Sequence, residues 1–161
     1  MKMNKNNMTE KTFAMFLWAK HKKEWSLTEQ AVALAMCKGS LTYEHIVEAQ
    51  DDIDAQDYYV LTDEEADERC TEYIKEALWT FKASFLAGET GIDEEVFTRL
   101  AEGYDSSNEA IESIINANGG MDSFVKAAVS ADGRGHFLNG HDGTEKEATY
   151  NGTTYYIYRM N

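Results

Sequence analysis

Apolar residues recur at helical spacing through most of the chain. The segment from Thr62 to about Phe81 shows this most clearly, because its apolar positions share one face and acidic residues occupy the other. Thr62 and Glu65 have the spacing of a capping box, which predicts where the helix begins. We expect one amphipathic helix here, with these side chains facing inward: Ala66, Cys70, Tyr73, Ile74, Ala77, Leu78 and Phe81.

Other helices are predicted by a capping residue followed by an apolar stripe. They are a helix after Thr9 or Thr12, residues 30–37 after Ser26 or Thr28, a short helix after Thr42, residues 96–101 after Asp93, a helix after a second capping box at Ser106 to Glu109, and residues 121–130. Helices therefore dominate the expected fold.

Beyond Ala131 glycines punctuate the sequence, which is typical of turns and loops. Asn151 and Gly152 lie between two β-prone runs, which predicts a hairpin with a two-residue type I′ turn. A short strand at residues 58–61 is expected to join that hairpin. The predicted class is mainly α (α+β), a single domain over residues 1–161. It has an N-terminal helical part, 1–57, and an acidic helical core with a C-terminal hairpin, 58–161.

Charge is strongly uneven along the chain. The net charge is −14, and eleven acidic residues lie between Asp51 and Glu76 against Arg69 and Lys75. The first 25 residues are basic, with six lysines and two glutamates. These lysines either pair with the acidic block or bind something anionic, and the first alternative is favoured because opposite charges within a small domain attract.

Length and cysteine content restrict the class of protein. A chain of 161 residues buries a core without crosslinks, and two cysteines make no disulfide framework, so a reducing compartment is expected. No apolar run reaches the length of a membrane span, and no signal-peptide core follows Met1. We expect a soluble cytoplasmic protein with no membrane partner and no cofactor.

One part of the chain resembles a known group of proteins. The segments concerned are Asp132-Gly133-Arg134-Gly135-His136-Phe137-Leu138, Asp142-Gly143-x-Glu145, Tyr155-Tyr156-Ile157-Tyr158-Arg159, and Leu61-Thr62-Asp63-Glu64-Glu65-Ala66-Asp67 leading to Trp79. Together they resemble small acidic proteins of tailed bacteriophages that have no assigned activity. The resemblance covers about residues 58–161. It implies a phage origin and action inside an infected host cell, and it transfers no catalytic residue.

The glycine-rich block offers candidate chemistry on a loop. Its candidate residues are Asp132, Arg134, His136, His141 and Asp142. Arg134 as a cation and His136 as a general base would suit a small enzyme. A metal site from the His and Asp residues is a further alternative, although their spacing is not diagnostic. The alternative favoured is structural: Asp132 caps the loop, Arg134 pairs with a helix carboxylate and His136 packs.

The acidic block gives the favoured function. The candidate partner-binding residues are Asp51, Asp52, Asp54, Asp57, Asp63, Glu64, Asp67, Glu68 and Glu72. Rows of carboxylates resemble phosphates to a cationic groove. We therefore expect an acidic inhibitor or modulator of a basic host nucleic-acid-binding protein, of the anti-restriction, anti-CRISPR or DNA-mimic type. The alternatives are a solvated acidic face without a partner, the Arg134/His136 enzyme, and a homodimer or larger homo-oligomer formed through Trp18, Trp25 and Trp79. Direct nucleic-acid binding is disfavoured because the chain is acidic.

Overall fold

The computed structural model describes residues 28–161. The helix expected after Thr9 or Thr12 and the basic N-terminal segment lie outside these residues. The described part packs into two compact units, one made of residues 28–66 with Leu138–Asn161 and the other of Asp67–Phe137. It contains eight α-helices and one three-stranded antiparallel sheet, which confirms the mainly α class. The expectation of a single domain stays a prediction.

The first unit is built on the sheet. Its strands are β1 (Tyr58–Leu61), β2 (Lys146–Tyr150) and β3 (Thr153–Arg159), in the order β1-β3-β2. The expected strand at 58–61 is thus confirmed as a partner of the hairpin. Asn151 and Gly152 have φ angles of 53° and 82°, which confirms the turn that the Asn-Gly pair predicts.

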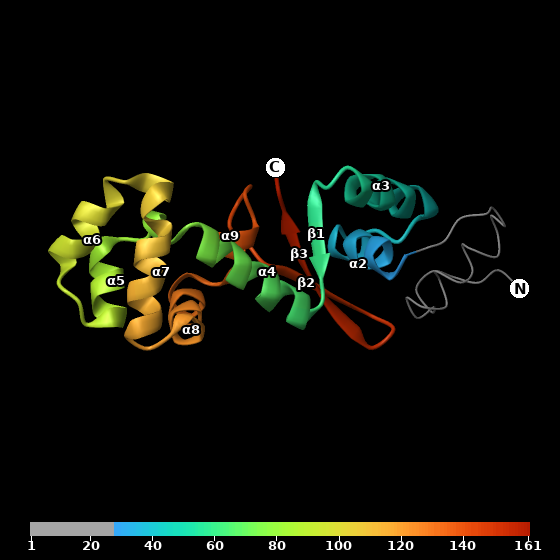
Figure 1. Cartoon of the computed structure of the whole chain (residues 1–161). Helices are drawn as coiled ribbons and strands as arrows, with labels where there is room; N and C mark the ends of the chain where they lie inside the picture. Colours follow the sequence, from blue (N-terminus) through green and yellow to red (C-terminus); the bar gives the residue numbers. More distant parts are fainter. Residues whose placement is uncertain (1–27) are drawn as a thin grey trace, which may run out of the picture. The chain divides into compact units, whose positions relative to one another are not determined.

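Two helices lie on one side of this sheet (Figure 1). Helix α2 (Glu29–Cys37) contacts all three strands, and α3 (Tyr43–Asp54) lies beside α2 and β1. The five consecutive residues Ala31–Ala35 of α2 are buried, three of them alanines whose small side chains allow a close approach. Thr28 and Thr42 cap the two helices through their hydroxyl oxygens, as the sequence predicts.

Two buried tyrosines on β3 bind carboxylates elsewhere in the first unit. Tyr155 donates to Glu29 Oε2 at 2.6 Å, and Tyr158 donates to Glu145 Oε2 at 2.5 Å. Burial, the hydrogen bond to Glu29 and the negative charge of Glu29 raise the pKa of Tyr155 to about 12. The Tyr155 phenol therefore stays protonated and continues to donate well above neutral pH.

The second unit is helical. After the end of α4 (Asp63–Glu76) it contains α5 (Ala83–Thr90), α6 (Glu94–Ala101), α7 (Asn108–Ala117), α8 (Met121–Asp132) and most of α9 (Arg134–Leu138). Phe81 lies at the centre of an aromatic cluster, with its ring centroid 5.7 Å from that of Phe85, 5.2 Å from Phe124 and 6.1 Å from Phe137. These rings tie the segment after α4 to α5, α8 and α9.

Helix α4 (Asp63–Glu76) begins where the sequence predicts and ends earlier. The capping box is confirmed, since Thr62 N donates to Glu65 Oε2 at 2.8 Å and Glu65 N donates to Thr62 Oγ1 at 3.4 Å. The prediction of one helix as far as Phe81 is wrong, and Tyr73 is 50% exposed. The side chain of Asn108 ends the helix by donating to the carbonyl of Lys75 and accepting from the backbone of Trp79.

Two further local predictions are wrong. The second capping box does not form, because Ser106 lies in a 3-10 turn, Tyr104–Ser107, and its hydroxyl donates to the carbonyl of Gly103. The loop expected around Gly135 is instead the short helix α9. Gly133, with φ of 78°, makes the break between α8 and α9, whereas Gly135 lies inside α9.

Truncating the buried face of α4 and the turn after it is expected to destabilise the protein strongly. Ile74 and Leu78 are fully buried, so Ile74→Ala or Leu78→Ala should lower the free energy of unfolding by about 2–5 kcal/mol. Glu68→Ala on the exposed face should change it by less than about 0.5 kcal/mol. Urea denaturation measures all three, and equal small effects would contradict the packing described here.

The hairpin turn is expected to depend on Gly152. Its φ of 82° strains any residue with a Cβ, so Gly152→Ala should destabilise the protein by about 1–2 kcal/mol and Gly152→Val by at least as much. Gly88 is the matched control, because it lies inside α5 with open space where a Cβ would be added. Gly88→Ala should stabilise by about 0.5–1 kcal/mol. Thermal unfolding of the variants checks the difference in sign.

Candidate functional site

The nine acidic residues singled out in the sequence lie on three elements. Asp51, Asp52 and Asp54 are on α3, Asp57 precedes β1, and the other five are on α4. The boundary between the two units divides them, since Asp67, Glu68 and Glu72 belong to the second unit. The carboxylates of α3 and those of α4 from Asp67 onward thus belong to different units.

Several of these carboxylates already have partners. The pairs are Asp52 with Lys38, Asp54 with Gln50 at 3.0 Å, Asp57 with Asn161 at 3.1 Å, Asp67 with Arg134 at 2.8 Å, and Glu72 with Arg69 at 3.2 Å. The side chains of Asp51, Glu64 and Glu68 are exposed and have no hydrogen-bond or ionic partner within residues 28–161. The charge that α4 can offer to another molecule is thus smaller than its sequence indicates.

Helix α3 carries an exposed carboxylate ridge that the sequence reasoning missed in part. Glu44, Glu48 and Asp51 follow one another at i, i+4 and i+7, which places them on one face. We call these three residues the α3 ridge. All three are exposed, and Ile46 and Ala49 are buried on the opposite face. The spacing is visible in the sequence, but the acidic block from Asp51 to Glu76 does not include Glu44 and Glu48.

The residues of the glycine-rich block lie in both units. Asp132 ends α8, and Arg134 and His136 are on α9 in the second unit, so the expectation that they share a loop is wrong. The ion pair of Arg134 with Asp67 confirms that Arg134 pairs with a helix carboxylate. The Arg134 side chain is only 12% exposed. His136 is exposed, with its ring edge-on to Phe137 at a centroid distance of 5.0 Å, so it does not pack in the core.

The other two residues of the block, His141 and Asp142, lie in a tight turn of the first unit. Both backbone amides donate to Asn139 Oδ1 at 3.0 Å. The hydroxyl and backbone amide of Thr144 donate to Asp142 Oδ1, which lowers the pKa of the Asp142 carboxyl. Within residues 28–161, no group of three or more His, Cys, Asp or Glu side chains is arranged to hold a metal ion.

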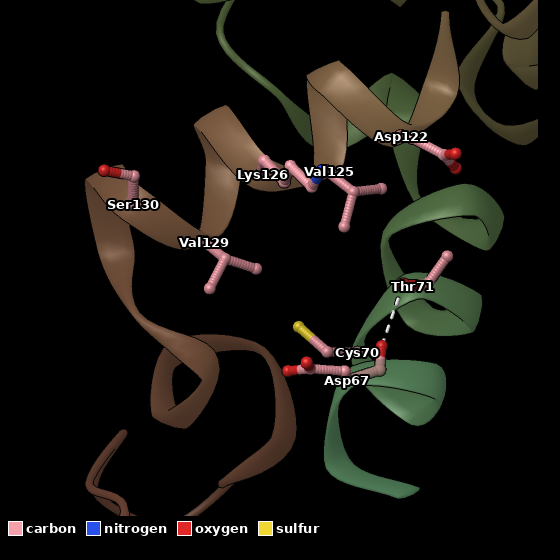
Figure 2. Close-up of a pocket in the computed structure, with 8 residues that line it drawn as sticks. All are labelled: Asp67, Cys70, Thr71, Asp122, Val125, Lys126, Val129 and Ser130. Carbon is pink, nitrogen blue, oxygen red and sulfur yellow. Dashed lines mark hydrogen bonds between the residues drawn. The ribbon is translucent and has the colours of Figure 1, made fainter. Parts of the chain in front are cut away.

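A cavity of about 450 Å³ lies between α4 and α8 in the second unit (Figure 2). Val125 and Val129 of α8 face Cys70 of α4 across it, and Asp67 lies at one end, where Arg134 holds its carboxylate. The remaining lining residues are Thr71, Asp122, Lys126 and Ser130. Cys70, Val125 and Val129 give the cavity an apolar wall, which suits the binding of an apolar group.

The described helices include none that is long and apolar enough to cross a bilayer. No protein-family model, curated protein or solved structure matches the chain.

Arg134 is expected to contribute to stability through its buried stem and its ion pair. Arg134→Ala should lower the free energy of unfolding by about 1–3 kcal/mol, because packing and a charged hydrogen bond are both lost. Arg99 is the matched control, since it pairs with Glu95 across one turn while its side chain is 74% exposed. Arg99→Ala should cost less than about 0.5 kcal/mol. Urea denaturation measures both losses of stability. An equally small loss for the two variants would show that Arg134 has no structural role.

Proposed function

We propose that the protein acts without catalysis, as a phage-encoded acidic inhibitor or modulator of a basic host protein that handles nucleic acid. The α3 ridge is the single observation that carries this proposal. The resemblance of residues 58–161 to small acidic phage proteins supports the cellular setting, an infected host cell. Anti-restriction, anti-CRISPR and other DNA-mimic activities belong to this class.

The charge density of α3 is close to that of a nucleic-acid strand. The helix has 12 residues, five carboxylates and no Lys or Arg. At a rise of about 1.5 Å per residue it is roughly 18 Å long, so the four carboxylates other than Asp52, which is paired with Lys38, give one negative charge per about 4.5 Å. One strand of B-DNA carries one charge per about 3.4 Å of axis. A cationic groove shaped for a phosphate strand therefore meets a similar density of charge on α3.

The ridge is also available for binding. Glu44, Glu48 and Asp51 have no hydrogen-bond or ionic partner for their carboxylates within residues 28–161. Of the flanking acids, Asp52 is paired with Lys38. Burial of Ile46 and Ala49 holds the helix on the first unit, so the carboxylates are presented on a supported surface. Such preorganised charge favours fast association with a cationic partner.

The alternatives have less support. Arg134, the cation of the enzyme alternative, is occupied by its ion pair with Asp67, and His136 does not line the cavity between α4 and α8. For a homodimer through tryptophans, Trp18 and Trp25 lie outside the described residues. Trp79 is half-buried and packs edge-on against Tyr104 at a centroid distance of 5.8 Å. Trp79 thus packs against a residue of its own unit.

Removing the charge of the ridge is expected to abolish partner binding without unfolding the protein. The ridge variant replaces the three ridge carboxylates and that of Asp54, one turn after Asp51 on α3, by amides of the same size: Glu44→Gln, Glu48→Gln, Asp51→Asn and Asp54→Asn. Immobilised protein is incubated with bacterial lysate at 50 mM salt, and duplex DNA is then added to displace proteins whose DNA groove is occupied. The wild type should release DNA-binding proteins, and the ridge variant should capture them at least about tenfold less.

The matched control removes the same amount of charge from exposed positions of the second unit: Glu89→Gln, Glu94→Gln, Glu102→Gln and Glu109→Gln. It should behave as the wild type, because local charge density and not net charge determines the fit. Circular dichroism confirms that both variants are folded. Equal capture by the wild type and the ridge variant, or captured proteins that DNA does not displace, would overturn the proposal.

A further inference from the structure

The positive charges of the first unit are concentrated at one place. Its described residues include thirteen Asp and Glu against three Lys and Arg. Those three cations, Lys38, Lys146 and Arg159, all line one cavity of about 150 Å³, together with His141. We call these four residues and the space between them the cationic pocket. A unit so rich in carboxylates would be expected to disperse its few cations among them.

The fold brings the cations together from separate elements. The beginnings of β1 and β2 and the end of β3 share one end of the antiparallel sheet, where Tyr58 pairs with Arg159 and Lys146 pairs with Ile157. Lys38 follows α2 and lies over the ring of Tyr58, 4.7 Å from its centroid. The pocket is therefore supported by regular structure on these sides.

The turn that supplies His141 is rigidly held. Asn139 is buried, its side chain accepts from the amides of His141 and Asp142, and it donates to the carbonyl of Thr144 at 2.6 Å. A Cβ on Gly140 would come within 2.6 Å of the carbonyl oxygen of Met160, so only glycine allows the turn to lie this close to the residue after Arg159. The pocket wall is thus formed before any ligand arrives.

Two of the cations form no salt bridge within residues 28–161. Lys146 is one of them, although its charge acts on the carboxyl of Asp142, which also lines the pocket, and lowers the pKa of that carboxyl. Arg159 Nη1 lies 3.3 Å from His141 Nε2, and because a guanidinium can only donate, Nε2 accepts and the imidazole contributes no negative charge. Lys38 and Lys146 also act on the nearby thiol of Cys37, where they oppose the effect of burial, which raises its pKa.

Three features oppose an anion in the pocket. Lys38 is paired with Asp52, Asp142 lines the cavity, and the C-terminal end of α2, which carries partial negative charge, lies beside it. Asp142 is occupied by two hydrogen bonds from Thr144, so its Oδ1 is directed to the turn. Lys146 and Arg159 form no salt bridge within residues 28–161, although Lys146 lies near enough to Asp142 to lower the pKa of its carboxyl, and Lys38 adds donors of its own.

We propose that the cationic pocket binds a phosphate group, either inorganic phosphate or the phosphate of a small monoester. Arg and Lys are the side chains that bind phosphate most strongly, through charge-assisted hydrogen bonds. A volume of about 150 Å³ suits a phosphate with a few further atoms. This inference does not rest on the function proposed for α3.

The test is a titration of the ¹⁵N-labelled full chain with inorganic phosphate, followed by amide chemical shifts at constant ionic strength maintained with NaCl. The wild type should show saturable shifts for residues 139–146 and for Arg159. Lys146→Gln should raise the dissociation constant about tenfold or more, since a charged hydrogen bond is lost. Arg159→Gln is a second variant with the same expected effect, in case one substitution disturbs the fold.

Lys126→Gln is the matched control, because Lys126 lines the cavity of the second unit and its loss should leave phosphate binding unchanged. A parallel titration with glycerol 3-phosphate separates the two ligand sources: tighter binding than that of phosphate identifies a monoester, and weaker binding identifies the free ion. Shifts that rise linearly with phosphate, or that remain unchanged in both pocket variants, would overturn the proposal.

Discussion

The pairing of β1 with β3 is the contact on which the first unit depends. It joins residues about a hundred positions apart, with Val60 opposite Ile157, while the whole second unit lies between them in the sequence. Closing so long a loop costs conformational entropy that grows only slowly with length. The cost is offset because Val60, Ile157 and Tyr155 bury their side chains in the same core as α2. Without this pairing β1 would have no place in the sheet, and the cationic pocket would lose the Tyr58 and Arg159 that lie side by side.

Most of the features that the sequence predicted correctly are set by neighbouring residues. Thr28 and Thr42 cap helices through the next turn, Thr62 and Glu65 form a reciprocal pair three residues apart, and Asn151 with Gly152 makes a turn by itself. At the end of α4, where the prediction failed, a distant residue decided the outcome. Asn108 reaches the end of α4 from another helix and stops it at Glu76, although the apolar stripe continues as far as Phe81. The spacing of apolar residues indicates which positions can be buried. It does not indicate which backbone groups will form hydrogen bonds with a distant side chain.

In the candidate sites, the sequence shows which residues are charged, but it does not show which of them are paired with each other. Counting acidic residues identified a block from Asp51 to Glu76, yet Asp67 is paired with Arg134, sixty-seven positions away, and Asp52 with Lys38. The sequence predicted that Arg134 pairs with a helix carboxylate, but the fold was needed to show that this carboxylate is Asp67. Helical spacing alone predicts the α3 ridge. A count of charge along segments of the sequence does not reveal that Glu44 belongs to it, because such a count ignores which residues share a helix face. The cationic pocket could not be found from sequence, since its residues come from four elements and become neighbours only through strand register.

The two proposed sites follow from one arrangement of charge in the first unit. Like charges one turn apart on α3 repel each other and destabilise the helix by a few tenths of a kcal/mol for each pair. Lys146 or Arg159 beside Glu44 and Glu48 would relieve that repulsion, but the fold places both at the end of the sheet, where they repel each other instead. Clustering the carboxylates on α3 and clustering the cations at the end of the sheet both lower the stability of the protein relative to a surface on which opposite charges alternate. Charges that are kept apart at a cost in stability are typical of binding surfaces, because the missing counter-charge is then supplied by a partner.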